Sequence, residues 1–478
     1  MPATGPDRTA RMLAGLHVPA VGNLAISPAL LERHAKSTAH WWNDYERRIG
    51  EPLRKWSATE VAAAPGAVVF YPFSGPDFPT LQRFFPDASR YVMVSLQPAD
   101  PPPDLDRASA AELGGFFERF DGAWKQFAQI GFFRTLDLEA EVRRANMRVG
   151  VTAALMAFSA RMGYEVIAVE PVRVNESGID LELNPGDRLN PATWSSVRLV
   201  LGQNARLVQL DYVRINLSDT ALKANPAQRA WIERMAGHPV LLKAASHLLQ
   251  QANFSILRDA ILKRAPGVVQ DETGLEYGRL KEAFIVTLHG KFAKPYQLFR
   301  ADAQRSLVAA YAASTDTKPL PFRMSYQRTE GANLQVAWRP GLQTIEARVR
   351  AARMPQAQML EARIAEQLAS YTQRRRKLFL TRSVSDTRHA SYVDTIRSYV
   401  SSLLGARARS SNGAALISLS LAPDGTLQVV QVERNSGSTT FDRHVKTVLQ
   451  GSRRFPAWPE SMRKDGDLAV VMLHVPEL

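Results

Sequence analysis

The pattern of the sequence changes after Pro340, and this change divides the chain. Residues 334–338 read as a short strand, whereas residues 342–380 are rich in Ala, Arg, Gln and Glu, a composition that favours helix. A single hydrophobic core stops growing at about 250–300 residues, and the chain has 478 residues, so we expect at least two domains. We predict an α/β domain over residues 1–340, a helical linker over 341–381 and a smaller domain over 382–478.

Strand and helix patterns are mixed within residues 1–340 and predict one large mixed α/β domain. Apolar runs at residues 67–71 and 90–96 read as buried strands. Helices are expected from about residue 109 to 130 and at 227–235, 240–251 and 254–264. The first of these helices carries aromatic side chains at helical spacing, a pattern typical of a core face: Phe116, Phe117, Phe120, Trp124 and Phe127.

The last 90 or so residues show a regular succession of predicted helices, strands and turns. In chain order they are a helix at 389–404, a strand at 414–421, a turn at 423–426, a strand at 427–432, a helix to about 450, a proline-locked loop at 455–459 and a strand at 468–475. Gly425 supplies the positive φ that the turn requires. The order predicts a three-stranded antiparallel sheet with two helices, so we expect an α+β chain overall.

This order of elements and turn residues resembles the C-terminal domain of the TonB and TolA proteins. The matching residues are Ser418 to Leu421 with Pro423-Asp424-Gly425, Val429 to Val432, Ser436-Gly437, Phe441-Asp442, Phe455-Pro456, Pro459 and the final strand. The chain departs from the family at residues 405–413, where a Tyr-Pro pair is usual between the first helix and the first strand.

The resemblance implies a cell-envelope interaction protein whose C-terminal domain docks a partner, or a second copy of itself, by β-strand pairing. An edge strand suits this role because its N–H and C=O groups are unpaired on one side. The expected docking strand comprises Leu468, Val470, Val471, Leu473 and Val475, with residues 427–432 as the alternative edge. A link to TonB-type transport is the finer hypothesis.

The loop over residues 71–78 has two prolines, a glycine and an aspartate at the end of a predicted strand. Together with residues 84–88, 132–135 and 269–274, it resembles a group of uncharacterised exported bacterial proteins, which implies kinship but no activity. Ligands of open α/β sheets settle at the carboxyl ends of strands, so we expect this loop to line the main cleft. The candidate cleft residues are Tyr71, Ser74, Asp77, His247 and Asp271.

A hydrolase with its site at this turn is one alternative. Ser74 would be the nucleophile, and Asp77 or Asp271 with His247 or His289 would supply the base and the group that orients it. The G-x-S-x-G motif is absent, and the simpler interpretation is that Ser74 and Asp77 bond backbone groups of their own turn. We therefore assign no catalytic residue and favour a protein that is not an enzyme.

Metal and cofactor chemistry have little support in the sequence. There is no cysteine, no H-x-x-x-H or H-E-x-x-H spacing, and no glycine-rich phosphate loop, so we expect neither a metal nor a cofactor.

The formal net charge of +14 suits acidic partners. The chain also contains a basic run, Arg374-Arg375-Arg376-Lys377. A further alternative is therefore a scaffold protein that binds anionic polymers through this run. No nucleic-acid-binding motif accompanies this run, so no nucleic-acid partner is expected.

The expected location is the periplasm, with the leader absent from this sequence. The N-terminus lacks the apolar run of a signal peptide, and no stretch reaches the roughly 18 apolar residues of a membrane span. The absence of cysteine fits an oxidising compartment. The cytoplasm is the alternative location.

Overall fold

The computed structural model of the chain forms two compact units, an N-terminal unit, Met1–Leu368, and a C-terminal unit, Ala369–Leu478. The structure describes residues 5–18, 27–105, 109–131, 150–184, 191–203, 206–292, 294–295, 299–324, 326, 331–352, 377–380, 387–404, 415–434, 436, 438–452, 454–462 and 468–475. The seam between the units falls inside the segment predicted as a linker.

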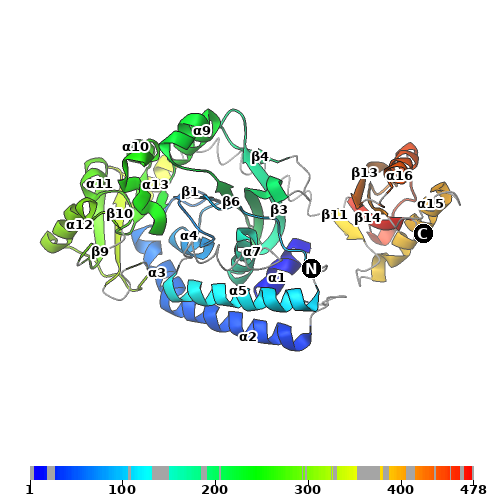
Figure 1. The fold of residues 1–478 in the computed structure, drawn as a ribbon, viewed down its shortest axis with the longest axis horizontal. Helices are drawn as coiled ribbons and strands as arrows, with labels where there is room; N and C mark the ends of the chain where they lie inside the picture. The colour runs from blue at the N-terminus through cyan, green and yellow to red at the C-terminus, as the bar shows by residue number, and fades with distance from the viewer. Residues whose placement is uncertain are drawn as a thin grey trace. The chain divides into compact units, whose positions relative to one another are not determined.

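The N-terminal unit is built on a ten-stranded mixed sheet with the order β4-β3-β5-β6-β2-β1-β7-β8-β10-β9 (Figure 1). Its five central strands run parallel: β6 (Arg206–Arg214), β2 (Arg90–Ser95), β1 (Val68–Pro72), β7 (Val240–Leu242) and β8 (Gly267–Gln270). Antiparallel pairing extends the sheet on one side through β5 (Val197–Gln203), β3 (Glu165–Val174) and β4 (Leu181–Leu183). On the other side it continues through β10 (Asn333–Trp338) and β9 (Ile285–Gly290).

Helices surround this sheet, and the described ones with their bounds are α1 (Gly5–Leu13), α2 (Pro28–Tyr45), α3 (Glu51–Glu60), α4 (Phe78–Phe84), α5 (Ala110–Ile130), α7 (Val151–Arg161), α8 (Asp219–Ala224), α9 (Pro226–Met235), α10 (Ser255–Arg264), α11 (Tyr277–Ala283), α12 (Ala301–Ala313) and α13 (Ile345–Ala352). Helix α5 begins where the sequence predicts, because Ser109 and Glu112 form a capping box. Helices α2 and α5 lie side by side, with Trp42 edge-on to Trp124 at 5.8 Å between ring centroids (Figure 1).

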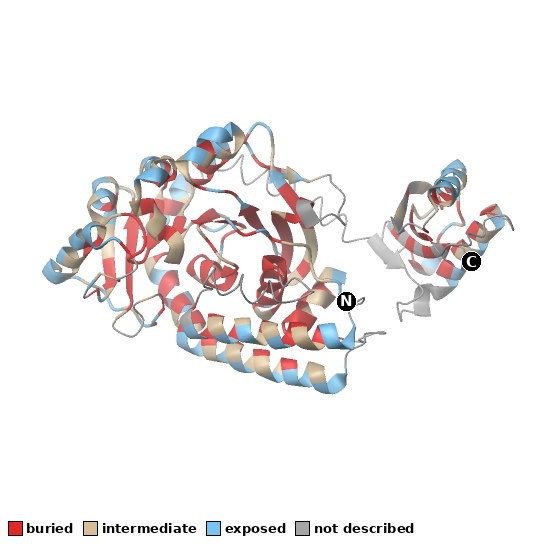
Figure 2. Cartoon of the chain, viewed as in Figure 1, coloured by how far each residue is buried: buried red, intermediate tan, exposed pale blue. Residues whose placement is uncertain are grey.

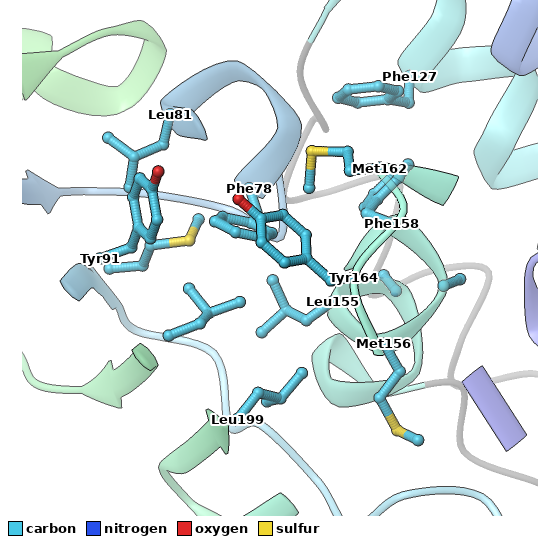
Figure 3. Packing of buried hydrophobic residues seen from close by; sticks show 14 of the residues in the cluster. Phe78, Leu81, Tyr91, Phe127, Leu155, Met156, Phe158, Met162, Tyr164 and Leu199 are labelled. Carbon is cyan, nitrogen blue, oxygen red and sulfur yellow. The ribbon is translucent and has the colours of Figure 1, made fainter. Parts of the chain in front are cut away.

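The core lies between the sheet and these helices, and strands β1, β2, β7 and β8 are buried throughout (Figure 2). The aromatic face predicted on residues 109–130 is buried in this core. Figure 3 shows Phe78 between Tyr91 and Tyr164, with ring centroids 5.1 and 6.3 Å away. These rings fix α4 against β2, and so they hold the loop that joins β1 to α4.

One predicted helix is wrong. Residues 240–251 contain strand β7 followed by a 3-10 helix, η3 (Ala244–Gln250). Val240–Leu242 are extended because β1 and β8 pair with them on both sides, and this tertiary pairing overrides the local helical pattern.

The C-terminal unit has a four-stranded sheet with the order β11-β14-β12-β13. Strands β12 (Ala415–Leu421), β13 (Leu427–Arg434) and β14 (Leu468–Val475) form the predicted antiparallel sheet, accompanied by the predicted helices α15 (Thr387–Leu404) and α16 (Thr439–Gly451). This confirms the α+β class. Strand β11 (Lys377–Leu380) pairs parallel to β14 and lies in the segment predicted to be helical.

Candidate functional site

The carboxyl ends of β1 and β7 form a topological switch point in the N-terminal unit. Strand β1 continues through α4 to β2 on one side, whereas β7 continues to β8 on the other side. Ligands of open α/β sheets bind at such points, outside the carboxyl ends of the strands. The loop over residues 73–77 follows β1, and Lys243 and Ala244 follow β7, so these residues are the candidate ligand site.

The backbone is strained on both sides of this switch point. Phe73 has φ 57° and Ala244 has φ 58°, in the left-handed region that favours glycine. Such a residue costs about 1–3 kcal/mol, and strain of this kind clusters at binding and catalytic sites. Two strained residues within two positions of the ends of the strands that flank one switch point mark this edge as a candidate for function.

Asp77 gathers the polar groups of the site. The Tyr71 hydroxyl donates to Asp77 Oδ2 at 3.0 Å, and the Gly75 N–H donates to Oδ1 at 3.1 Å. Lys243 Nζ lies 3.9 Å from Asp77 Oδ2 and donates to the Gly131 carbonyl at 3.2 Å. Tyr71, Asp77 and Lys243 are all buried.

Burial also changes the acidities of these groups. It lowers the pKa of Lys243, although the carboxylates of Asp77, Asp271 and Glu272 oppose this change. It raises the pKa of Tyr71, and Asp77 raises that pKa further. The charges of the three carboxylates therefore reach Lys243 at this edge of the sheet.

Strand β8 brings Asp271 and Glu272 to this edge. Thr273 donates to Asp271 Oδ1 from its backbone N–H at 2.9 Å and from its hydroxyl at 2.5 Å. Asn333 Nδ2 donates to Glu272 Oε2 at 2.7 Å. Both carboxylates are buried, and their hydrogen bonds hold them in fixed positions.

The other two candidate residues lie differently. The buried Ser74 hydroxyl donates to the Val94 carbonyl of β2 at 3.2 Å, so it is bonded to backbone of a neighbouring strand. His247 Nδ1 lies 3.4 Å from the Ala244 carbonyl, and burial lowers the pKa of His247. No bond between Ser74 and a histidine is found in the described part of the chain, so the hydrolase alternative gains no support from this geometry.

Lys243 is the residue that sequence reasoning missed. The sequence pattern of residues 240–251 predicted a helix, so no strand was expected to end just before Lys243. The available signal was a lysine directly after the apolar run Val240–Leu242, the same pattern of strand and polar end that drew attention to residues 71–78.

The second candidate site is the edge of the C-terminal sheet. Strand β14 pairs with β12 over residues 469–475 and with β11 over 468–471. Leu468, Val470 and Val471 therefore have β11 beside them, whereas Leu473 and Val475 pair with β12 alone among the described strands. Among the described strands, none pairs with residues 472–475 of β14 on the side where β11 lies.

Of the basic run proposed to bind anionic polymers, the structure describes only the last residue, Lys377. Arg374, Arg375 and Arg376 lie outside the described residues, and Lys377 opens β11. Binding of an anionic polymer at this run stays a prediction. No three His, Asp or Glu side chains of the described chain are grouped closely enough to hold a metal ion.

Comparison with known families gives a match in the C-terminal unit. Residues 389–472 match the family model described as the TonB C terminal. Comparisons with curated proteins and with solved structures find no match. The match supports a protein-interaction role in the cell envelope and gives no information on the N-terminal unit. Among the helices that the structure describes, none combines the length and the apolar character of a membrane-spanning segment.

Proposed function

We propose that this chain is a periplasmic interaction protein whose C-terminal domain docks an extended segment of a partner by β-strand pairing. The observation that carries the proposal is the half-open edge of β14 in a domain that matches the TonB C terminal. A partner strand gains main-chain hydrogen bonds along such an edge, and side-chain pockets add specificity. A role in TonB-type transport is the finer form of the same proposal.

The β14 edge is better suited to docking than the β13 edge. Val471, Leu473 and Val475 are buried in the core of the domain, so β14 is held in place before a partner arrives. The pairing of β13 with β12 is interrupted by two register shifts, between Leu416 and Ile417 and between Ser420 and Leu421. Bulges of this kind bend an edge strand and discourage further pairing.

Selection from a random peptide library tests the docking proposal. Peptides about ten residues long, the upper length of a typical strand, are panned against the full chain. We expect the bound peptides to be extended and poor in proline, because proline cannot donate to a ladder. Bound peptide should slow amide hydrogen exchange at those of residues 472–475 whose N–H groups point away from β12, and should leave β13 unchanged. Peptides that protect β13 or the N-terminal unit instead would contradict the proposal.

A second proposal concerns the N-terminal unit. We propose that Tyr71, Asp77, Lys243 and Asp271 at the switch point belong to its ligand site, with His247 at the margin. The strained residues Phe73 and Ala244 support this, because strain that persists in a fold is commonly retained for function. Anionic-polymer binding at residues 374–377 and hydrolysis at Ser74 have no comparable support.

Replacing Ala244 by glycine tests whether the positive φ at this position destabilises the folded N-terminal unit. Ala244→Gly should stabilise the N-terminal unit by about 0.5–1 kcal/mol, because glycine adopts positive φ readily and the relief exceeds its entropy cost. Ala309→Gly, the same substitution at an exposed position within α12, should destabilise it by about 0.5–1 kcal/mol. Urea denaturation measures the change in the free energy of unfolding for each variant. A loss of stability in both variants would contradict the argument that Ala244 is strained.

A further inference from the structure

Strand β11 occupies part of the edge that the docking proposal assigns to a partner. Lys377 pairs with Leu468, and the register continues to Leu380 and Val471. The strand lies outside residues 389–472, the span that matches the TonB C terminal. The match therefore does not account for β11.

We propose that β11 is an intramolecular occupant of the docking edge and that a partner engages β14 by displacing it. This inference rests on the proposed function, because it assumes that β14 is the docking strand. The free chain would then be in a closed state, and the partner would bind the fraction of molecules in which β11 has left the edge.

The pairing of β11 has the features of a displaceable strand. It covers four positions of β14, whereas β12 pairs with β14 over seven positions, Ala415↔Val475 to Leu421↔Ala469. It is parallel, and parallel pairs are slightly less stable per residue than antiparallel ones. In the described sheet β11 has β14 as its one strand neighbour. Its loss leaves the antiparallel sheet of β14, β12 and β13 intact.

A longer strand can outcompete β11 for the edge. A partner segment that pairs along the whole of Leu468–Val475 gains pairing at Met472, Leu473, His474 and Val475, which the described residues of β11, Lys377–Leu380, do not reach. The sequence of β11, Lys-Leu-Phe-Leu, indicates what this edge accepts: an extended, proline-free segment with apolar side chains that runs parallel to β14. We assign the edge to a partner peptide of this chemistry.

The test vacates the edge in the full chain and offers the strand back as a peptide. Alternate N–H groups of a strand point to opposite sides, so the double variant Leu378→Pro/Phe379→Pro removes a donor whichever residue faces β14. The matched control is Leu378→Val/Phe379→Val, which keeps both donors and a high strand propensity. The probe is a fluorescent peptide with the sequence of residues 377–382, Lys-Leu-Phe-Leu-Thr-Arg, and its binding is measured by anisotropy.

We expect the double-proline chain to bind this peptide about tenfold more tightly than the parent and the double-valine chain. The apparent affinity is proportional to the fraction of molecules whose edge is open. If β11 occupies the edge about nine-tenths of the time in the parent chain, vacating the edge raises the apparent affinity about tenfold. Amide hydrogen exchange at those of residues 468–471 whose N–H groups face β11 should quicken in the double-proline chain and slow again when the peptide is added.

Equal affinities within about twofold for the three chains, or no binding by the double-proline chain, would overturn the inference. Dimerisation of the double-proline chain in place of peptide binding would also overturn it, because the edge would then belong to a second copy. Peptide binding reports on the occupancy of the edge, whereas library selection reports on docking, so failure of one can be distinguished from failure of the other.

Discussion

Replacing Asp211 by Asn is expected to destabilise the N-terminal unit by about 3–5 kcal/mol, the cost of breaking a buried ion pair from one side. Asp211 lies on β6 and is fully buried. Its Oδ1 accepts from Arg198 Nε at 2.7 Å, and its Oδ2 accepts from Arg90 Nε at 2.7 Å. The neutral amide would leave two buried guanidinium groups without this counter-charge.

The position of this carboxylate in the sheet explains the size of the effect. Arg198 is on β5, Asp211 on β6 and Arg90 on β2, three adjacent strands. Arg90 also donates to Asp180 at 3.1 Å, and Gln209 donates to Asp211 at 2.7 Å. One carboxylate therefore joins the parallel centre of the sheet to its antiparallel side.

The same group should make stability depend on pH. Burial by itself would raise the pKa of Asp211, but the guanidinium groups of Arg198 and Arg90 outweigh burial and lower it. A depressed pKa in the folded state gives stability that is present above about pH 4, the unfolded value, and is lost as the pH falls through the folded pKa. The Asn variant should lose this part of the acid dependence.

Urea denaturation between acid and neutral pH measures both effects. Glu182→Gln is the matched control, because it makes the same chemical change at an exposed ion pair with Arg173 between β3 and β4. Exposed pairs contribute little, so the control should unfold like the parent. Similar unfolding of the Asp211 and Glu182 variants would mean that the buried network does not stabilise the sheet as its geometry indicates.

The sequence predicted the C-terminal domain well because its signals are local. The turn at Gly425, the alternating strands and the cap at Ser438 each depend on a few neighbouring residues, and the last strand has the predicted bounds, Leu468–Val475. Strand β11 was missed because its four residues lie in a helix-like composition. It is extended because of β14, whose residues lie far away in the sequence.

The candidate site of the N-terminal unit was predicted in part, for a related reason. Tyr71, Asp77 and Asp271 follow or end apolar runs that read correctly as strands, so the rule for strand ends found them. Lys243 follows a three-residue strand that exists because β1 and β8 enclose it. Strain at Phe73 and Ala244 has no sequence signal, since neither residue type favours positive φ.

Gly425→Val is expected to destabilise the C-terminal unit by about 2–6 kcal/mol, from φ strain of about 1–3 and overpacking of about 1–3. Gly425 has φ 84°, and a Cβ there would lie 2.0 Å from the Phe455 carbonyl oxygen. The neighbour is backbone and cannot rotate away. The Phe455 N–H donates to the Gly425 carbonyl at 2.8 Å, so moving the loop over residues 455–459 would break the bond that positions it.

Gly341→Val separates the two contributions. Gly341 has nearly the same conformation, φ 89°, but no atom of the described residues lies within 4 Å of the position of its Cβ. Valine there should cost the strain alone, about 1–3 kcal/mol. Scanning calorimetry follows the units separately, so each variant should shift the transition of its own unit, and Gly425→Val should lose more free energy of unfolding. If the two losses were equal, the Gly425 turn would have room for a side chain, and the contact with Phe455 would not explain why glycine stands there.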